Sequence, residues 1–552
     1  MTGNDAAAGD GRMTLVVAAS SAGTVFEWYD FFIYGTLATI IAKHFFAGVT
    51  EAQSYLFALL TFAAGFAVRP FGALFFGWFG DRIGRKSTFL VTISVMGLAT
   101  FAVTLLPDYS ALGVVAPLLL VFVRVLQGFA IGGEYGGAAI YVAEHASQTR
   151  RGTATGWIQS AAGIGLLLAI VVILVLRRIM GEAAFSDWGW RIPFGLSLLL
   201  LAISLWIRLK LNESPAFLRI REAGKDSKAP LTESFLRWPN LKIVLIVLFA
   251  LLTGQGVVWY TAMFYTQVFL DRVTHVDPQT MNLLVLTAVA VSIPLYNFFG
   301  WLSDLIGRKP VMLFGLGLAA ASFIPGFQML ADAVNPALVA AGKTAPVTVV
   351  ADPADCSFQF DLVGKAEFKS SCDIAKNALA GAGVPYTNVA APGGALARVK
   401  VGGTTDVSSP DGRELSPTDL KAARAAFAAR LKTVLIAAGY PETADASKID
   451  LSRALPILIL FMIAACALYG PQAAALVELF PTRIRYTALS LPYHVGVGWF
   501  GGFLPAIAVA AVIATGNVYA GLWYPVIVSA VGFLVTLFWL PETHRRDIHA
   551  MD

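Results

Sequence analysis

Charged side chains are scarce in this chain. Only 14% of its 552 residues are Asp, Glu, Lys or Arg, whereas 57% are hydrophobic. A soluble domain carries about 25% charged residues, so the composition excludes an ordinary soluble protein and predicts one that crosses the membrane many times. The first residues are polar and the apolar run after them has full membrane length, so we expect no cleavable signal peptide.

Patterns typical of catalytic and nucleic-acid-binding proteins are also missing. The sequence has no phosphate-cradling glycine loop, which argues against ATP-driven transport. Its six histidines and three cysteines show no metal-ligand spacing. Lys and Arg lie in short segments between apolar runs, which reflects membrane topology rather than a nucleic-acid-binding surface. We therefore expect no enzymatic activity, no cofactor, no metal and no nucleic-acid partner.

Apolar runs of membrane length predict twelve helices. They lie at roughly 14–42, 53–79, 88–106, 112–143, 153–177, 189–209, 241–270, 281–303, 310–331, 453–478, 486–512 and 518–540. With the N-terminus in the cytoplasm, the cytoplasmic segments hold 19 Lys and Arg and the short outer loops hold five. The positive-inside rule therefore predicts that both termini are cytoplasmic.

An internal repeat divides the chain into two halves. Residues 77–86 (GWFGDRIGRK) and 300–309 (GWLSDLIGRK) match at seven of ten positions. A weaker match joins 143–154 (AEHASQTRRGTA) to 477–488 (VELFPTRIRYTA). Members of the first pair are 223 residues apart and those of the second 334, so about 111 residues are inserted into the second half.

The predicted fold is an all-α polytopic membrane protein of two six-helix pseudo-repeats, with a small α+β extracytoplasmic domain inserted between helices nine and ten. The expected divisions are an N-terminal half (1–209), a central cytoplasmic linker (210–240), the first part of the C-terminal half (241–332), the inserted domain (333–452) and the rest of the C-terminal half (453–552).

The insertion differs sharply in composition from its surroundings. VTVVAD and ARVKVGG predict strands, and CDIAKNALAGAG and SPTDLKAARAAFAARLKTVLIAAG predict helices. Cys356 and Cys372 both lie in it, whereas Cys466 lies in a predicted membrane helix. A disulfide can form outside the cytoplasm. The sequence is therefore compatible with a Cys356–Cys372 disulfide and equally with two free thiols.

Acidic residues inside the first apolar run are the strongest functional signal. Glu27 and Asp30 lie near the middle of the bilayer, where an ionised carboxylate costs at least a few kcal/mol. A rise of 1.5 Å per residue places Arg69 and Arg124 at a similar depth in the second and fourth helices. We expect these four side chains to face one central aqueous cavity.

These groups suggest complementary roles. A guanidinium matches the geometry of a carboxylate, so Arg69 and Arg124 are candidates for binding an anionic substrate. Glu27 or Asp30 could bind a proton while the substrate occupies the arginines, and release it on the other side. The alternative is that the four groups form permanent ion pairs that assemble the N-terminal half.

Other polar residues are weaker candidates. The further substrate contacts predicted are Tyr34, Gln127, Gln255 and Tyr260, with Trp259, Tyr265, Gln267, Tyr493 and His494 as possible cavity residues. Aromatic residues in membrane helices more often serve packing. Glu134 is a candidate for proton coupling or an inner gate, with a polar helix contact as the alternative, and the glycines around it favour close helix packing.

Charges also recur at matched positions near the cytoplasmic ends of the predicted helices. They are Asp81, Arg85 and Glu144 in the first half and Asp304, Arg308 and Glu478 in the second. We expect them to gate transport, as charge pairs that form in one conformation and break in another. Solvated helix flanks would explain isolated charges, but not the matched spacing.

The motifs resemble those of the major facilitator superfamily, in its metabolite:proton symporter branch. The resemblance rests on FEWYDFFIYG, AVRPFGALFFG, RVLQGFAIGGEYGGAAIYVAEHA, ELFPTRIRY and the paired loop motif, and it covers both halves, about 430 residues, but not the insertion. It implies alternating access, in which the cytoplasmic motifs latch the two halves together. It also implies functional basic residues at Arg69 and Arg124.

The predicted function is proton-coupled import of a small organic metabolite, with a carboxylate favoured, across the inner membrane of a bacterium. Uptake of a zwitterionic osmolyte such as betaine or proline is the alternative within transport. A transporter-derived sensor that uses the outer domain is the alternative outside it. The expected partners are the small-molecule substrate, protons and the lipid bilayer, and the sequence predicts no partner for the outer domain.

Overall fold

A computed structural model describes most of the chain. The described residues are 3–46, 51–210, 212–359, 368–403 and 405–548. Within them, the side chains of 3–12, 15, 51–60 and 62–63 are not described.

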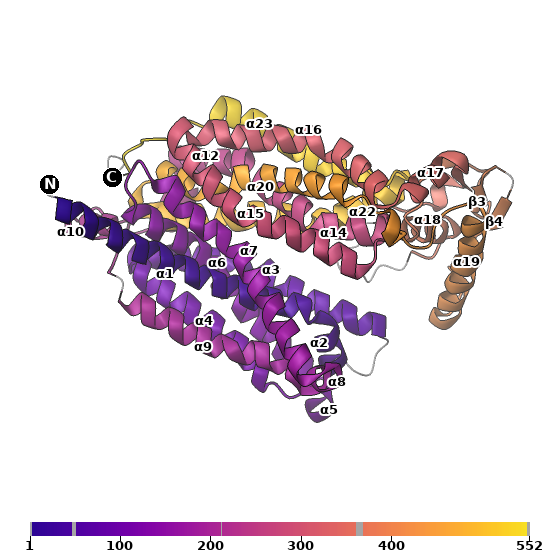
Figure 1. The fold of residues 1–552 in the computed structure, drawn as a ribbon, viewed down its shortest axis with the longest axis horizontal. Coiled ribbons are helices and arrows are strands. Elements are labelled where there is room, and N and C mark those ends of the chain that lie inside the picture. The colour runs from indigo at the N-terminus through magenta and orange to yellow at the C-terminus, as the bar shows by residue number, and fades with distance from the viewer. Residues whose placement is uncertain (1–2, 47–50, 211, 360–367, 404, 549–552) are drawn as a thin grey trace.

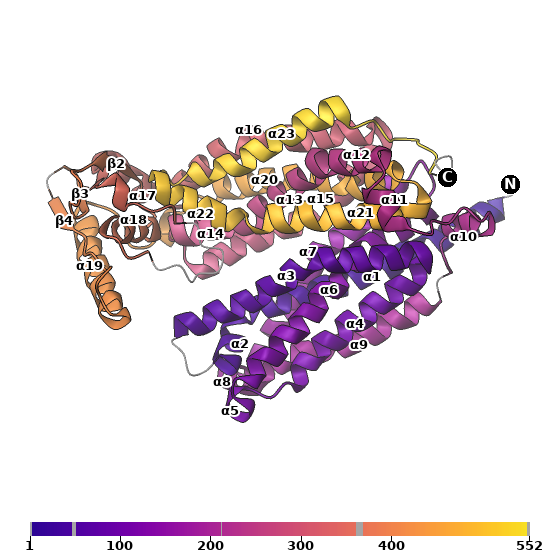
Figure 2. The same cartoon turned by 180° about the vertical axis from the view of Figure 1, so that it is seen from behind.

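Long helices form two bundles that lie side by side (Figures 1 and 2). The first comprises α1 (Gly3–Thr36), α2 (Ala38–Phe45), α3 (Glu51–Arg82), α4 (Arg85–Leu105), α5 (Tyr109–Leu112), α6 (Val115–His145), α7 (Arg151–Met180), α8 (Glu182–Ala184), the π-helix η1 (Phe185–Gly189) and α9 (Arg191–Leu209). The short helices α10 (Pro215–Glu222) and α11 (Pro230–Phe235) link it to the second.

The second bundle begins with an interrupted helix over Trp238–Val273. It contains α12 (Trp238–Val247), η2 (Leu248–Leu252), α13 (Thr253–Tyr260), η3 (Thr261–Tyr265), α14 (Thr266–Val268) and η4 (Phe269–Val273). The bundle continues with α15 (Pro278–Ile306), α16 (Arg308–Val334), α20 (Leu451–Leu479), η7 (Thr482–Ile484), α21 (Arg485–Tyr493), η8 (His494–Gly501), α22 (Leu504–Thr515), η9 (Ala520–Leu522) and α23 (Trp523–Trp539).

Ten helices of the described part of the chain are long and apolar enough to cross a membrane. They begin at Arg85, Val115, Arg151, Arg191, Trp238, Pro278, Arg308, Leu451, Thr482 and Ala520. The helices α1 and α3 are also long, at 34 and 32 residues, and they pack along α7 and α6. The predicted total of twelve spans therefore stays a prediction.

Glycines bring α3 and α6 into close contact. A Cβ atom at Gly128 would lie 2.0 Å from the carbonyl oxygen of Gly65, and one at Gly132 would lie 2.4 Å from that of Arg69. No side chain fits at such distances, so the glycine spacing serves helix packing. It holds the Arg69 segment directly against α6.

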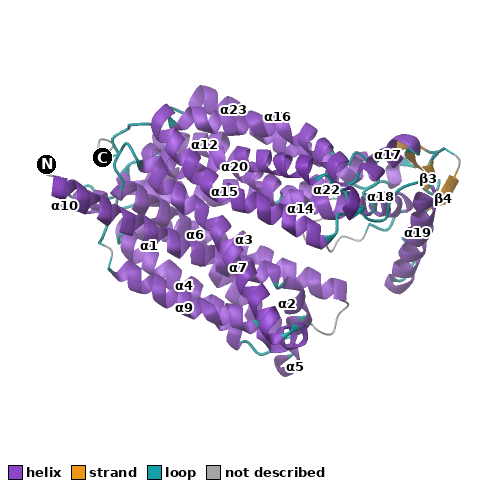
Figure 3. Ribbon diagram, in the orientation of Figure 1, coloured by secondary structure: helices purple, strands orange, loops and turns teal. Residues whose placement is uncertain are grey.

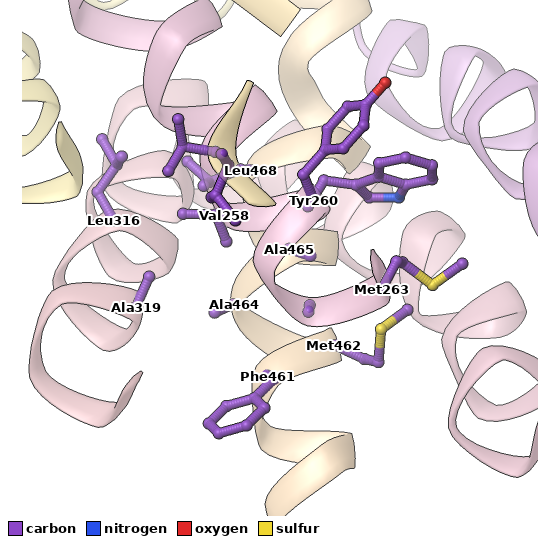
Figure 4. Packing of buried hydrophobic residues seen from close by; sticks show 14 of the residues in the cluster. Val258, Tyr260, Met263, Leu316, Ala319, Phe461, Met462, Ala464, Ala465 and Leu468 are labelled. Atoms are coloured by element: carbon purple, nitrogen blue, oxygen red, sulfur yellow. The ribbon is translucent and has the colours of Figure 1, made fainter. Parts of the chain in front are cut away.

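The core of the second bundle is apolar. Val258 and Met263 belong to the same buried hydrophobic cluster as Leu316 of α16 and Phe461 and Leu468 of α20 (Figure 4). Little hydrophobic driving force exists between helices in lipid, so such van der Waals contacts hold this half together.

A small unit of helices and strands lies at the end of the molecule opposite the termini (Figures 1 and 3). It contains α17 (Pro336–Thr344), β1 (Val347–Ala351), η5 (Pro353–Asp355), α18 (Ser371–Gly381), β2 (Tyr386–Ala390), β3 (Arg398–Val401), β4 (Thr405–Ser408), α19 (Pro417–Ala437) and η6 (Ala446–Lys448). The strand order is β2-β1-β3-β4, with β1 and β2 parallel and the other pairs antiparallel.

Local sequence explains the elements of this unit. Ser416 caps α19 by accepting from the Asp419 N–H, with Pro417 at the first helical position. Parallel strands need a crossover, and α18 supplies it between β1 and β2. The unit has its own core, which includes Val349, Leu379 and Phe427. Strands β2 and β4, which complete the sheet, were not predicted.

The unit is attached to the second bundle through backbone hydrogen bonds. Ala444 N–H donates to the His275 carbonyl oxygen at 2.9 Å, and Tyr386 N–H donates to that of Gly516 at 2.9 Å. It therefore packs on the ends of helices that belong to the second bundle.

Cys356 and Cys372 form a disulfide across 16 residues of sequence, and Cys466 is a buried free thiol. A loop of this length stabilises the folded unit by about 3 kcal/mol on the chain-entropy model. We expect Cys356→Ser to lower the free energy of unfolding of this unit by roughly that amount, measured by pulse proteolysis of the full chain in urea. Cys466→Ser is the matched control, and equal urea midpoints for Cys356→Ser and wild type would contradict the expectation.

Candidate functional site

A small cavity lies between the two bundles, and seven described elements line it. The lining residues are Glu27, Trp28 and Phe31 of α1, Arg69 of α3, Ile131 and Tyr135 of α6, Trp259 and Tyr260 of α13, Tyr469 of α20, and Tyr493, His494, Val497 and Gly498 of α21 and η8. Its volume is about 30 Å³, enough for about two water molecules. Both halves of the repeat thus contribute to one enclosed site.

Glu27 and Arg69 bring opposite charges into this cavity. Glu27 is 6% exposed, and neither side chain has a hydrogen-bond or ion-pair partner among the described residues. The Arg69 guanidinium instead packs on aromatic rings, 4.0 Å from the Phe66 centroid and 5.2 Å from that of Phe31. A buried charge without a partner is costly, so these two groups are available for a ligand or a proton.

Aromatic side chains form much of the rest of the wall and connect the halves. The rings of Tyr135 and Tyr493 stack with centroids 3.8 Å apart, and the Tyr469 and Tyr493 hydroxyls lie 2.7 Å apart. The rings of Trp28 and Trp259 lie 5.8 Å apart. Tyr135 and Trp28 come from the first half and their partners from the second, so a relative movement of the halves would open this wall.

The structure places Asp30, Arg124, Tyr34 and Gln127 in a second buried cluster within the first half. Asp30 accepts a hydrogen bond from the Ser197 hydroxyl at 2.6 Å, and the Arg124 guanidinium carbon lies 3.6 Å from the Tyr34 ring centroid. Gln127 donates to the Thr100 hydroxyl at 2.6 Å.

This arrangement corrects two expectations from the sequence. None of these four residues lines the cavity that contains Glu27 and Arg69, so the interpretation of one shared cavity is wrong for Asp30 and Arg124. Among the described residues, no ion pair joins Glu27 or Asp30 to Arg69 or Arg124, which disfavours a permanent pairing of these groups. Depth was predicted from helical rise, but the direction of each side chain depends on how the helices pack.

Glu134 has a partner that the sequence did not indicate. Its carboxylate lies 2.9 Å from Arg208 of α9 and accepts from the Thr92 hydroxyl at 2.6 Å. The groups are fully buried, so Glu134 is part of a polar contact inside the first half rather than of the cavity lining.

The second half contains buried polar groups with unsatisfied atoms. Within the part of the chain that the structure describes, both amide atoms of Gln255 and of Gln472 lack hydrogen-bond partners, as does Nε2 of His494. Gln255 does not line the cavity, whereas Tyr260, Trp259, Tyr493 and His494 do. Gln472 was missed, although a lone glutamine in an apolar membrane helix is itself a functional signal. Tyr469 was missed because nothing distinguishes it from a packing residue.

Charged residues connect the two halves at the end of the molecule where both termini lie (Figure 1). In the first repeat, Arg85 lies 3.2 Å from Asp81 and 3.8 Å from Glu144. Glu144 also lies 2.6 Å from Arg485, which belongs to the second half. Asp81 accepts hydrogen bonds from the N–H groups of Tyr486 and Thr487 at the start of α21, at 3.2 and 2.8 Å.

The second repeat forms the same arrangement, with the roles of the two halves exchanged. Arg308 lies 2.6 Å from Asp304 and 3.2 Å from Glu478, and Glu478 lies 2.8 Å from Arg151 of the first half. Asp304 accepts from the N–H groups of Gly152 and Thr153 at the start of α7, at 2.8 and 2.7 Å. Each half therefore inserts an aspartate at a helix N-terminus of the other, where a carboxylate is favoured.

We call these eight residues the interhalf network: Asp81, Arg85, Glu144, Arg151, Asp304, Arg308, Glu478 and Arg485. Six were predicted from the repeat. Arg151 and Arg485 were not singled out, although they occupy matched positions in the weaker repeat. The helix-capping carboxylates Glu213 and Glu542, which accept from the N–H groups of Arg85 and Arg308 at 3.1 and 3.0 Å, were also missed.

The chain is similar to known transporters in sequence. A family model described as "Sugar (and other) transporter" matches residues 15–234. The shikimate transporter of Escherichia coli (strain K12) is 38% identical over 325 residues, which cover 58% of this chain and 73% of that protein. The proline/betaine transporter of the same strain is 33% identical over 333 residues, which cover 58% of this chain and 65% of that protein.

The fold is similar to that of a solved symporter. The proton:xylose symporter XylE bound to 6-bromo-6-deoxy-D-glucose superposes with a TM-score of 0.62 over 98% of each chain, at 16% sequence identity. At this identity the likeness concerns the fold alone.

Proposed function

This chain belongs to the major facilitator superfamily, in its metabolite:proton symporter branch, and on that premise we propose that it imports a small organic carboxylate together with protons by alternating access. The observation that carries the proposal is the pair of charges Glu27 and Arg69, which lie in one cavity between the halves and form no ion pair among the described residues. Arg69 supplies the positive charge for a carboxylate, and Glu27 supplies the proton-binding group.

The proposed topology follows from the same family. We place twelve spans in two six-helix halves in the inner membrane of a bacterium, with both termini in the cytoplasm and the inserted unit outside. The interhalf network then lies on the cytoplasmic side and holds the halves together there. The described conformation corresponds to one closed on the inside, and transport requires the network to break as the halves rock.

A specific observation favours a second candidate, a zwitterionic osmolyte. Trp28, Trp259, Tyr135 and Tyr493 line the same cavity as Glu27, and aromatic faces bind quaternary ammonium groups. The similarity to a proline/betaine transporter supports the same substrate class. In that case Arg69 would bind the carboxylate end and the aromatic wall the ammonium end.

Uptake into proteoliposomes separates the candidates. We expect gradient-dependent uptake of a labelled monocarboxylate such as shikimate by wild type, and a loss of at least about tenfold in Arg69→Gln, since a charge-assisted hydrogen bond contributes about 1.5–3 kcal/mol. Arg272→Gln, which changes an arginine with a 73% exposed side chain, is the matched control. Uptake of betaine in place of carboxylates would favour the osmolyte, and carboxylate uptake unchanged in Arg69→Gln would exclude Arg69 as the anion site.

A further inference from the structure

A second cavity lies outside the transport site, between the inserted unit and the end of α22. Its volume is about 380 Å³, in the lower part of the range of about 300–1,000 Å³ that is usual for small-ligand pockets. Strands β1 and β2, helix α18, the segment after β1 and Ala514 of α22 line it. It shares no lining residue with the cavity that contains Glu27 and Arg69.

Lys376 of α18 is the positively charged residue in this lining. The residue is only 7% exposed, and its ammonium group has no hydrogen-bond or ion-pair partner in the part of the chain that the structure describes. Burial lowers the pKa of the Lys376 ammonium, and the negative charge of Asp373 acts in the opposite direction. A buried ammonium without a partner is costly, and an anion bound beside it would offset that cost.

Asp373, the acidic residue whose charge acts on Lys376, is engaged elsewhere. The carboxylate of Asp373, one turn before Lys376, accepts from the N–H and hydroxyl of Ser357 at 2.9 and 2.7 Å. It also accepts from the Gln359 amide at 3.4 Å. These hydrogen bonds hold Asp373 toward the segment after β1 and leave Lys376 directed to the cavity.

The rest of the lining is largely apolar. It consists of Val349, Ala351, Pro353, Val389, Ala390 and Ala514, with Asn388 and the disulfide-bonded Cys356. One cation beside an apolar surface matches a ligand with one negative charge and an apolar body. A second charge on the ligand would be buried without a partner.

We propose that this cavity binds a small monocarboxylate with an apolar body, whose carboxylate pairs with Lys376 and whose body lies against β1, β2 and the end of α22. The site is built jointly by the inserted unit and the second bundle, because Asn388 donates to the Thr515 carbonyl oxygen at 3.1 Å. It is a ligand site separate from the transport cavity and does not depend on the proposed transport function.

Benzoate is a suitable probe, with benzyl alcohol as its uncharged counterpart. Binding to the full chain in detergent is measured by equilibrium dialysis for wild type, Lys376→Met, Lys376→Arg and Arg69→Gln. We expect Lys376→Met to weaken benzoate binding at least about tenfold, while Lys376→Arg and Arg69→Gln retain it and benzyl alcohol binds weakly to all four. Absence of benzoate binding in wild type, equal binding in Lys376→Met, or loss only in Arg69→Gln would overturn the proposal.

A measurement on the wild-type chain does not depend on the folding of a variant. A small amine-acetylating reagent modifies accessible lysines, and mass spectrometry quantifies each site. We expect benzoate to slow acetylation of Lys376 and not that of Lys400, which is exposed on β3, while benzyl alcohol slows neither. Equal acetylation of Lys376 with and without benzoate would overturn the proposal.

Discussion

Glu27→Gln is expected to abolish proton-driven accumulation while leaving substrate exchange intact. For a monocarboxylate carried with one proton, transport is electroneutral and the pH difference alone drives it. Two pH units then support about hundredfold accumulation, at 1.36 kcal/mol per unit. Glutamine keeps the size of the side chain and cannot release a proton, so the accumulation ratio should fall to about one. Exchange of labelled for unlabelled substrate should persist, because Arg69 remains in the cavity.

Two matched variants make this result specific. Glu182→Gln changes a carboxylate with a 68% exposed side chain, and its accumulation ratio should equal that of wild type. Asp30→Asn changes the carboxylate of the second cluster, which accepts from the Ser197 hydroxyl and lies outside the cavity. If Asp30→Asn abolished accumulation and Glu27→Gln did not, the coupling proton would belong to the second cluster instead.

Removing the negative charge of Glu144 or Glu478 is expected to open the interhalf network. Glu144 is paired across the halves with Arg485 at 2.6 Å, and Glu478 with Arg151 at 2.8 Å. Breaking a buried ion pair by removing one partner costs about 3–5 kcal/mol, and water can solvate the remaining charge once the halves separate. Glu144→Gln and Glu478→Gln should therefore shift the equilibrium at least about a hundredfold toward the conformation that is open at this end.

Hydrogen exchange reports this opening without a label. The N–H groups of Tyr486 and Thr487 donate to Asp81, and those of Gly152 and Thr153 donate to Asp304. Because these acceptors lie on the opposite half, we expect faster exchange at α7 and α21 in both variants. Glu442→Gln, which removes an exposed partner of Lys432 on the inserted unit, should leave exchange unchanged. Unaltered exchange in Glu144→Gln and Glu478→Gln would show that the network does not hold the halves together.

Much of the helical framework could be predicted because it depends on local composition. The predicted span at 88–106 corresponds to α4 (Arg85–Leu105), and the one at 453–478 to α20 (Leu451–Leu479). Hydrocarbon-length apolar runs must satisfy their backbone hydrogen bonds internally, so composition alone predicts a helix. Six of the eight residues of the interhalf network were predicted, because a repeat puts equivalent residues at equivalent places.

The candidate site was predicted only in part, and α1 illustrates why. Glu27 and Asp30 are three residues apart, so their side chains point about 60° apart around the helix axis. Glu27 faces the cavity between the halves, and Asp30 faces Ser197 of α9 inside the first half. Spacing sets this angle, but which direction meets a cavity is set by the neighbouring helices. The pairing of Glu134 with Arg208 depends on packing in the same way.

By itself, the sequence determined that this is a membrane protein and predicted two related halves with an inserted unit, since hydropathy, charge distribution and internal repetition are properties of the chain alone. The tertiary structure decided which buried charges are paired and which are not. Arg208 and Glu134 neutralise each other, whereas Glu27, Arg69 and Lys376 have no partner among the described residues. The physical reason is distance: the free energy of a buried charge depends on groups within a few ångströms, and helices far apart in sequence bring those groups together.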